Sequence, residues 1–333
     1  MKAAPAFWNS LGPLALALLP LASLYALVME GRRELYLRGW KKTLRLPVPV
    51  VVVGNITVGG TGKTPLIVWL AHGLARRGYR PGIVTRGYGG SGKGESEVRP
   101  DSDPGDAGDE TVLLARRSGC PVWRGADRVA AGRALLAAHP ECDCILSDDG
   151  LQHYRLARRV EIAVVDGARG FGNRLPLPAG PLREPVDRLE QVDAVVINGP
   201  GEVPVPAGFA MRLSGEKLVN MVQGHRVRDL AAKAGTKVHA VAGIGNPDRF
   251  FRTLRAAGLE VTEHAFPDHH RFTPADLDFG DDLPVIMTEK DAVKCFGFAA
   301  ERWWYLPVAA SADPALLDVV TTRLGAPRTL PAR

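Results

Sequence analysis

The chain has 333 residues, of which 46% are hydrophobic and 23% charged, and its formal net charge at pH 7 is +6. This length exceeds what one compact domain usually needs, so we expect two α/β units and an N-terminal appendage. The positive charge favours anionic partners, but no arginine-rich arm or zinc-finger spacing is present, so a nucleic-acid partner is not expected. The four cysteines form no CxxC pair, which is typical of reduced thiols in a cytosolic domain.

Residues 11–29 are almost wholly apolar and carry no formal charge. Such a segment is nearly long enough to span a bilayer core of about 30 Å, although Pro13 and Pro20 would kink a helix there. We therefore predict that residues 1–45 form a membrane helix, which spans the bilayer or lies in its interface, and a basic juxtamembrane segment. The basic residues that follow the apolar run are Arg32, Arg33, Arg38, Lys41, Lys42 and Arg45. They place the main body on the cytoplasmic side and disfavour a cleaved signal peptide, while a buried amphipathic hairpin is the remaining alternative.

Residues 47–65 read as a buried strand, a glycine loop and the first turn of a helix, and the amphipathic run 66–77 continues that helix. In this arrangement main-chain N–H groups surround phosphate oxygens, Lys63 reaches the β- and γ-phosphates, and the Thr64 hydroxyl ligates Mg²⁺. The residues predicted to hold the nucleotide are Gly59, Gly60, Thr61, Gly62, Lys63 and Thr64. The general pattern asks for glycine where Thr57 stands, so a plain glycine turn is the alternative.

Strands and helices then alternate, which is typical of a parallel sheet with helices on both faces. The predicted strands cover 82–85, 121–124, 143–147, 161–166 and 194–198, with helices over 109–118 and 126–138. A second alternation has strands over 237–242, 260–265, 285–288 and 303–307. We predict a phosphate-loop domain over 46–208 and a smaller α/β domain over 209–333 that closes over a cleft, with the last helix able to pack back on the first. The segment 87–106 reads as a mobile loop near the site.

The predicted strand over 143–147 delivers Asp148 and Asp149 at its C-terminal end, where ligands bind in parallel sheets. An acidic residue at this place commonly holds Mg²⁺ together with the hydroxyl of the phosphate loop. Adjacent side chains on a strand point in different directions, so one of the two is expected to contact the metal with Thr64. An Asp-Asp-Gly turn without a metal is the alternative.

Five further segments carry chemistry that the residues alone leave open. Asp109 reads as a helix cap or as a functional carboxylate, and His269 and His270 read as structural histidines or as a general base. The proline-rich loop over 175–185 presents Arg183 for a phosphate or for a surface ion pair. Arg128 indicates anion handling or a solvated helix face. Lys290, in a segment that begins like a capped helix, projects towards a ligand or only caps.

Eight segments together resemble one family, the tetraacyldisaccharide 4′-kinases of lipid A biosynthesis, in order and over nearly the whole chain. They are residues 54–65, 85–89, 108–110, 148–153, 177–184, 242–247, 266–269 and 288–292. The resemblance implies an ATP- and Mg²⁺-dependent lipid kinase of the Gram-negative inner membrane with an N-terminal membrane helix. It also implies that Asp109 and His269 form the dyad that acts as general base, with Arg128 and Arg183 at the reaction centre. The motif residues Gln152 and His153 are assigned with Arg128 to the substrate side, and His270 receives no role.

The expected reaction transfers the γ-phosphoryl group of ATP to the 4′-hydroxyl of a tetraacylated glucosamine disaccharide 1-phosphate. Lys63 and Arg183 would offset the moving charge, and Asp109, oriented by His269, would position the hydroxyl. A membrane-associated P-loop ATPase switch without a lipid acceptor is the main alternative, and a binding module for anionic lipid or nucleic acid is the second. No obligate protein partner is expected.

Overall fold

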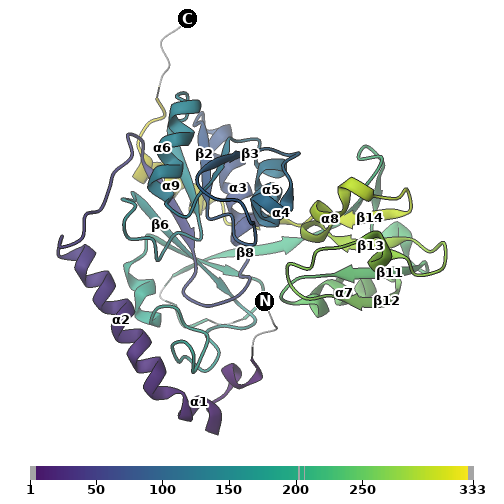
Figure 1. Cartoon of the computed structure of the whole chain (residues 1–333), viewed down its shortest axis with the longest axis horizontal. Coiled ribbons are helices and arrows are strands. Elements are labelled where there is room, and N and C mark those ends of the chain that lie inside the picture. The colour runs from purple at the N-terminus through teal and green to yellow at the C-terminus, as the bar shows by residue number, and fades with distance from the viewer. Residues whose placement is uncertain (1–4, 202, 206, 329–333) are drawn as a thin grey trace, which may run out of the picture.

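The computed structural model describes residues 5–201, 203–205 and 207–328. The chain begins with η1 (Ala6–Asn9), α1 (Pro13–Ala17) and α2 (Leu19–Leu37), which run along the outside of the larger part of the molecule (Figure 1). Leu21, Leu24, Leu27 and Val28 of α2 are all more than half exposed. Among the described helices, none combines the length and the apolar character that crossing a bilayer requires.

The larger part, here called the large unit, is built on a nine-stranded sheet in the order β15-β8-β7-β6-β1-β5-β2-β4-β3. The seven strands from β8 to β4 are parallel, and β15 and β3 add an antiparallel strand at either edge. The strands are β1 (Val50–Gly54), β2 (Pro81–Thr85), β3 (Ser96–Val98), β4 (Val122–Arg124), β5 (Cys144–Asp148), β6 (Val160–Asp166), β7 (Ala194–Asn198), β8 (Gly208–Ser214) and β15 (Ala309–Ala312). The predicted parallel sheet is confirmed.

Both faces of this sheet are covered because the central strands are apolar on both sides. Val51 and Val53 face a core that α3 (Lys63–Arg76), α5 (Asp109–Ser118) and α9 (Ala315–Leu324) complete. Val50 and Val52 face the opposite core, which α6 (Arg128–Ala138) and η2 (Val186–Gln191) cover. This doubly covered parallel sheet gives one edge at which all the strand ends meet.

The remainder, the small unit, is a six-stranded mixed sheet in the order β10-β9-β14-β13-β11-β12. Its strands are β9 (Lys217–Asn220), β10 (Val227–Asp229), β11 (Lys237–Ala242), β12 (Glu260–Ala265), β13 (Val285–Thr288) and β14 (Trp303–Leu306). α7 (Pro247–Ala256) packs on one face, and α8 (Glu289–Cys295) packs on the other with the short helices η4 (Pro274–Leu277) and η5 (Phe296–Phe298). The short helix η3 (Ala231–Lys233) follows β10.

The chain passes between the two units twice, so the domain boundary is not the single one predicted at residue 208. β8 pairs with β7, and β15 pairs with β8. The strands that precede and follow the small unit in the sequence therefore both belong to the large sheet. Figure 1 shows β8 extending from the large unit towards the small one. The sequence conceals β8 because it follows a Pro- and Gly-rich stretch and buries only Met211. The segment 87–106 also contains structure, namely β3 and α4 (Pro104–Ala107).

Candidate active site

The loop between β1 and α3 has the backbone that a phosphate-binding loop needs. Gly59 and Gly62 have φ values of 106° and 94°, a left-handed region that disfavours any side chain. A Cβ atom on Gly62 would also lie 2.7 Å from the Nδ2 atom of Asn198. Lys63 is the first residue of α3, so the loop leads directly into a helix N-terminus. The main-chain N–H groups of such a junction attract anions.

One side chain of the loop itself, Asn55, and two from other places, Arg169 and Asn198, hold the carbonyl groups of this loop. Asn55 Nδ2, Arg169 Nη2 and Asn198 Nδ2 donate to the main-chain oxygens of Gly59, Gly60 and Thr61, at 3.3, 3.2 and 3.0 Å respectively. With the carbonyl oxygens engaged by these donors, the opposite N–H side of the loop is available for phosphate oxygens. The loop is therefore fixed by the large sheet before a nucleotide arrives.

Asp148 lies beside the start of this loop, because β1 and β5 pair in parallel with Val53 opposite Asp148. Its side chain is buried, and the Thr85 hydroxyl donates to Oδ2 at 3.2 Å while Oδ1 has no hydrogen-bond partner. Burial and the neighbouring charge of Asp149 raise the pKa of Asp148 to about 6. A buried carboxylate with an unsatisfied oxygen has the properties of a cation ligand.

Asp149 is placed differently from Asp148, although the two are adjacent in the sequence. Its φ of 47° turns the side chain away from the strand direction and towards two cations. Arg183 Nη1 lies 3.0 and 3.1 Å from the two carboxylate oxygens, and Lys63 Nζ lies 3.4 Å from one of them. Although burial opposes ionisation, Lys63 and Arg183 outweigh it and lower the pKa of Asp149 to about 2. The structure thus brings Lys63, Asp149 and Arg183 together at the phosphate loop.

The residues assigned to the substrate side lie beneath the same loop. Arg128 is buried and donates to the main-chain oxygens of Gly125 and Asp148 at 3.0 and 3.2 Å. Gln152 donates to the main-chain oxygen of Asn55 at 3.1 Å. Burial and the charge of Arg128 lower the pKa of His153 to about 4, so this ring is neutral at pH 7. These contacts support the end of β5 and the start of the loop, and the assignment to the substrate stays a prediction.

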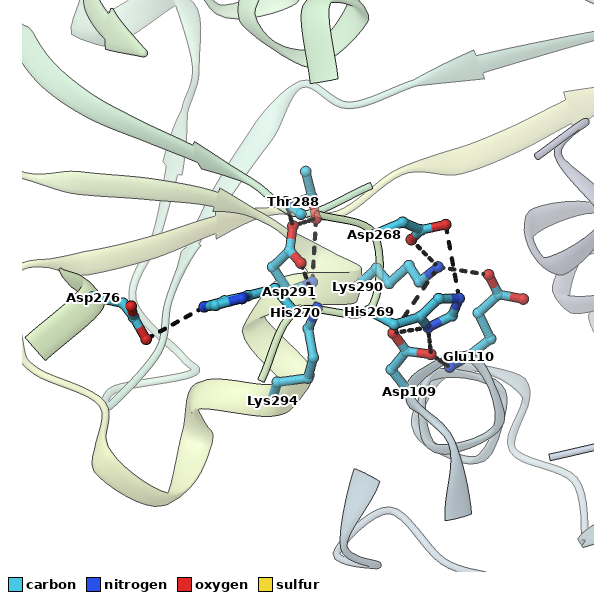
Figure 2. Close-up of polar contacts among 11 residues, drawn as sticks. Asp109, Glu110, Asp268, His269, His270, Asp276, Thr288, Lys290, Asp291 and Lys294 are labelled. Atoms are coloured by element: carbon cyan, nitrogen blue, oxygen red, sulfur yellow. Dashed lines mark hydrogen bonds and ion pairs between the residues drawn. The ribbon is translucent and has the colours of Figure 1, made fainter. Parts of the chain in front are cut away.

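Asp109 and His269 meet across the two units (Figure 2). Asp109 is the first residue of α5 in the large unit, and His269 follows β12 of the small unit. Nδ1 of His269 lies 3.0 and 3.1 Å from the two carboxylate oxygens of Asp109. Because an ionised carboxylate only accepts hydrogen bonds, Nδ1 carries a proton and donates a hydrogen bond to Asp109. Burial raises the pKa of Asp109, but the hydrogen bond from His269 and the charge of Lys290 outweigh it, so the pKa lies below its ordinary value.

The capping interpretation of Asp109 is wrong, because Asp109 is the first residue of α5 and not its N-cap. Gly108, with a φ of 89°, occupies the N-cap position, and Asp109 Oδ1 accepts from the main-chain N–H of Glu110 at 2.9 Å. The first turn of the helix therefore orients the carboxylate that His269 contacts. His270 faces away from this pair, towards Asp276 at 3.4 Å, as Figure 2 shows.

A polar cavity of about 400 Å³ adjoins the pair. It is lined by the glycine-rich residues 86–90 and 92–94 together with Arg124 and Ala126. The ring of Tyr88 packs edge-on against His269 with 5.3 Å between ring centroids, and a Cβ atom on Gly89 would lie 3.2 Å from Nδ1 of His269. The cationic side chains of Arg86, Lys93 and Arg124 make the cavity suitable for an anionic molecule.

Comparison with known proteins decides the family of this site. The family described as Tetraacyldisaccharide-1-P 4'-kinase (LpxK) matches residues 14–325. The chain belongs to this family. It is 56% identical over 326 residues to the tetraacyldisaccharide 4'-kinase of Alkalilimnicola ehrlichii, covering 95% of each chain. It is 52% identical over 312 residues to that of Pseudomonas aeruginosa PAO1, covering 93% of each. Its fold is similar to the crystal structure of LpxK from Aquifex aeolicus in complex with ATP, with a TM-score of 0.78 and 29% identity, covering 94% of this chain and 100% of that one.

The sequence interpretation missed two residues of this kinase site. Asn198 ends β7 and Arg169 lies in the turn after β6, and both hold the phosphate loop. The signal was available, because polar residues at the carboxyl ends of parallel strands meet at the ligand edge of the sheet. Neither residue forms part of a local motif, so only the strand order connects them to the loop.

Proposed function

We propose that the chain transfers the γ-phosphoryl group of ATP to the 4′-hydroxyl of a tetraacylated glucosamine disaccharide 1-phosphate. The observation that carries this proposal is the Asp109–His269 pair, which the two units assemble in a chain whose β1–α3 loop has the backbone of a phosphate-binding loop. The names of the relatives agree with it, and the Aquifex aeolicus relative was crystallised with ATP. A P-loop ATPase switch without an acceptor has no use for this pair.

The residues present fit a magnesium ion next to the nucleotide. Asp148 Oδ1 is buried without a partner, and Thr64 lies in the first turn of the neighbouring helix α3, so Oδ1 of Asp148 and the Thr64 hydroxyl would hold the ion. Mg²⁺ usually takes one or two protein oxygens and completes its shell with water and phosphate. In agreement with this, no cluster of three or more His, Cys, Asp or Glu residues suited to a metal occurs in the described part of the chain. The bound ion would supply positive charge that offsets the charge of the phosphates during transfer.

Lys63 and Arg183 would stabilise the charge that moves during transfer. Both now contact Asp149, whose low pKa keeps it ionised and the two cations together. We infer that phosphate oxygens of ATP take over some of these contacts, because phosphate binds a guanidinium group in the same forked geometry as a carboxylate. Asp149 then serves to hold the cations in place rather than as the main metal ligand.

Asp109 would orient the acceptor hydroxyl and take its proton. Its lowered pKa makes it a weak base, which suits a loose transition state in which the hydroxyl loses its proton late. The Nδ1–H group of His269 donates a hydrogen bond to Asp109 and fixes the carboxylate. The cationic cavity next to His269 lies where an anionic sugar phosphate can approach the pair.

The N-terminal helices would bring the enzyme to its lipid at the cytoplasmic face of the inner membrane. One face of α2 contacts the large unit, since the Tyr25 hydroxyl donates to the Arg183 carbonyl at 3.3 Å and the Tyr36 ring packs near Tyr154. The other face exposes the leucines at 21, 24 and 27. An exposed apolar stripe followed by basic residues is typical of a helix that binds an anionic membrane surface.

One assay tests the proposal. The full chain is incubated with ATP, Mg²⁺ and a tetraacyl disaccharide 1-phosphate in detergent micelles, and the lipid is analysed by mass for a second phosphate. Transfer to the lipid, with little ATP hydrolysis in its absence, is the expected result. Rapid hydrolysis that is indifferent to the lipid would instead favour the switch.

A further inference from the structure

Lys290 is the cation of a partly buried acidic cluster next to the Asp109–His269 pair (Figure 2). Its Nζ atom lies 2.9 Å from Glu110, 3.0 Å from Asp268 and 3.9 Å from Asp109. The Lys290 side chain is 16% exposed, and those of Asp109 and Asp268 are 4% and 7% exposed. One lysine therefore faces two buried carboxylates and a third, Glu110, whose side chain is 43% exposed.

Lys290 does not cap α8, because Thr288 does so. Thr288 is the N-cap of α8, and its hydroxyl accepts the main-chain N–H of Asp291 at 3.2 Å. Lys290 is thus free to extend from the first turn of α8 across the boundary between the units. It contacts Asp268 of its own unit and two residues of α5 in the large unit.

His269 lies between two of the carboxylates that Lys290 contacts. Nδ1 donates to Asp109, while Nε2 lies 3.7 Å from Asp268 Oδ2. Both carboxylates attract the same imidazole ring, and Lys290 Nζ lies 3.0 Å from Oδ1 of Asp268. The ammonium group at Asp268 reduces the attraction of Asp268 for the ring and leaves the ring oriented by Asp109.

We propose that Lys290 is a positioning residue for phosphoryl transfer, which holds the Asp109–His269 pair in its productive arrangement by balancing Asp268 and Glu110. The inference rests on the proposed kinase function and assigns Lys290 to the acceptor side of that site. Lys290 contacts neither the phosphate loop nor its supports among the described contacts, so it acts through the pair and not through ATP.

The charges around the pair set the expected direction of a pH effect. The titratable and charged groups facing it are Tyr88 from the glycine-rich loop, Asp109 and Glu110 from α5, Asp268 and His269 from the loop after β12, and Lys290 and Lys294 from α8. Burial raises the pKa of Asp109, and His269 and Lys290 lower it. Removing the lysine therefore moves ionisation of Asp109 to higher pH.

The test compares Lys290→Met, which removes the charge, with Lys290→Arg, which keeps it. For Lys290→Met we expect kcat at pH 7 to fall about 10- to 100-fold, with the KM for ATP within about twofold of wild type. The acidic limb of the kcat profile should move up by about one pH unit, the usual effect of one charge at this distance. Lys290→Arg should recover most of the rate and the original limb.

A neighbouring ion pair gives a matched control. Arg117 on α5 donates to Glu289 on α8 at 2.7 and 2.8 Å, so Arg117→Met combined with Glu289→Gln removes another contact between the same two helices. We expect this double variant to leave the acidic limb in place. An equal shift in the control, or an unshifted limb in Lys290→Met, would overturn the proposal, because the lysine would then only join the two units.

Two further measurements keep the inference testable if Lys290→Met folds poorly or the wild type proves not to be a kinase. Adding Asp268→Asn to Lys290→Met should restore folding and much of the rate, because the unbalanced carboxylate leaves together with its cation. Titration of the Asp109 carboxyl carbon by NMR, without any substrate, should show the upward shift in Lys290→Met. If the wild-type chain fails to phosphorylate the lipid but Lys290→Met shows this upward shift, the kinase function is refuted and the positioning role is kept. If the titration of Asp109 is the same in Lys290→Met as in the wild type, the positioning role alone is refuted.

Discussion

Replacing Asp148 by asparagine should stabilise the protein while abolishing its chemistry. Asp148 is buried, and its pKa of about 6 lies above the ordinary value of 3.8. Ionising this carboxylate in the folded state therefore opposes folding at neutral pH, because the protein without its metal supplies too little compensation. Asparagine has the same shape, carries no charge, and can still accept the hydroxyl proton of Thr85.

The magnitude follows from the two pKa values. With a folded pKa of about 6 and an ordinary value of 3.8, the destabilisation by Asp148 is about 3 kcal/mol at pH 7. Since the folded pKa is the higher one, stability is lost as pH rises from about 4 to about 6, and the difference shrinks to about 0.5 kcal/mol at pH 4. Arg128 and Lys63 lose a nearby counter-charge in the variant, so the net gain at pH 7 should be about 1–3 kcal/mol.

The assay is thermal or urea unfolding of both proteins without nucleotide or metal, at pH 7 and at pH 4.5. We expect Asp148→Asn to unfold at higher temperature at pH 7, with a smaller advantage at pH 4.5. Adding Mg²⁺ and ATP should stabilise the wild type more than the variant, since the ligand oxygen is gone. Equal or lower stability of the variant at pH 7 would refute the claim that the buried, ionised carboxylate of Asp148 destabilises the protein when no cation is bound.

The other predictions concern the remaining parts of the site and the N-terminal helix. Asp109→Asn should lower kcat by about 10² to 10⁴ and leave the ATP dissociation constant nearly unchanged, and a large loss of ATP binding would contradict its acceptor-side role. Asn198→Ala should raise the KM for ATP about fivefold through the loss of one hydrogen bond to Thr61, with kcat at saturation almost unaffected. Leu24→Glu with Leu27→Glu should reduce sedimentation with anionic vesicles without lowering ATP affinity, and unchanged sedimentation would exclude this face of α2 as the membrane contact.

The Asp109–His269 pair also bears on how the enzyme protects ATP from water. Asp109 belongs to the large unit, while His269 and Lys290 belong to the small one, so the pair is complete only when the units are together. β8 and β15 belong to the large sheet and carry the chain to and from the small unit. Assembly of the pair on closure would tie the orientation of the acceptor to exclusion of solvent.

The amino-acid sequence by itself determined many local elements of this protein, although not β3, β8 or β15. The strands over 194–198, 237–242 and 260–265 and the helix over 109–118 have the bounds predicted from the residue pattern. The loop from Gly59 to Thr64 could be recognised because its chemistry depends on a contiguous turn from strand to helix. Such features follow from periodicity and backbone preference, which act over a few residues.

Only the tertiary structure decided which distant groups meet. Asp148 and Asp149 are neighbours in sequence, yet the left-handed backbone at Asp149 directs one to Lys63 and Arg183 and leaves the other buried beside β1. The meeting of Asp109 with His269, 160 residues later, depends on how two sheets dock. Local pattern cannot encode such contacts, because their energies come from burial and charge that exist only after the chain has folded.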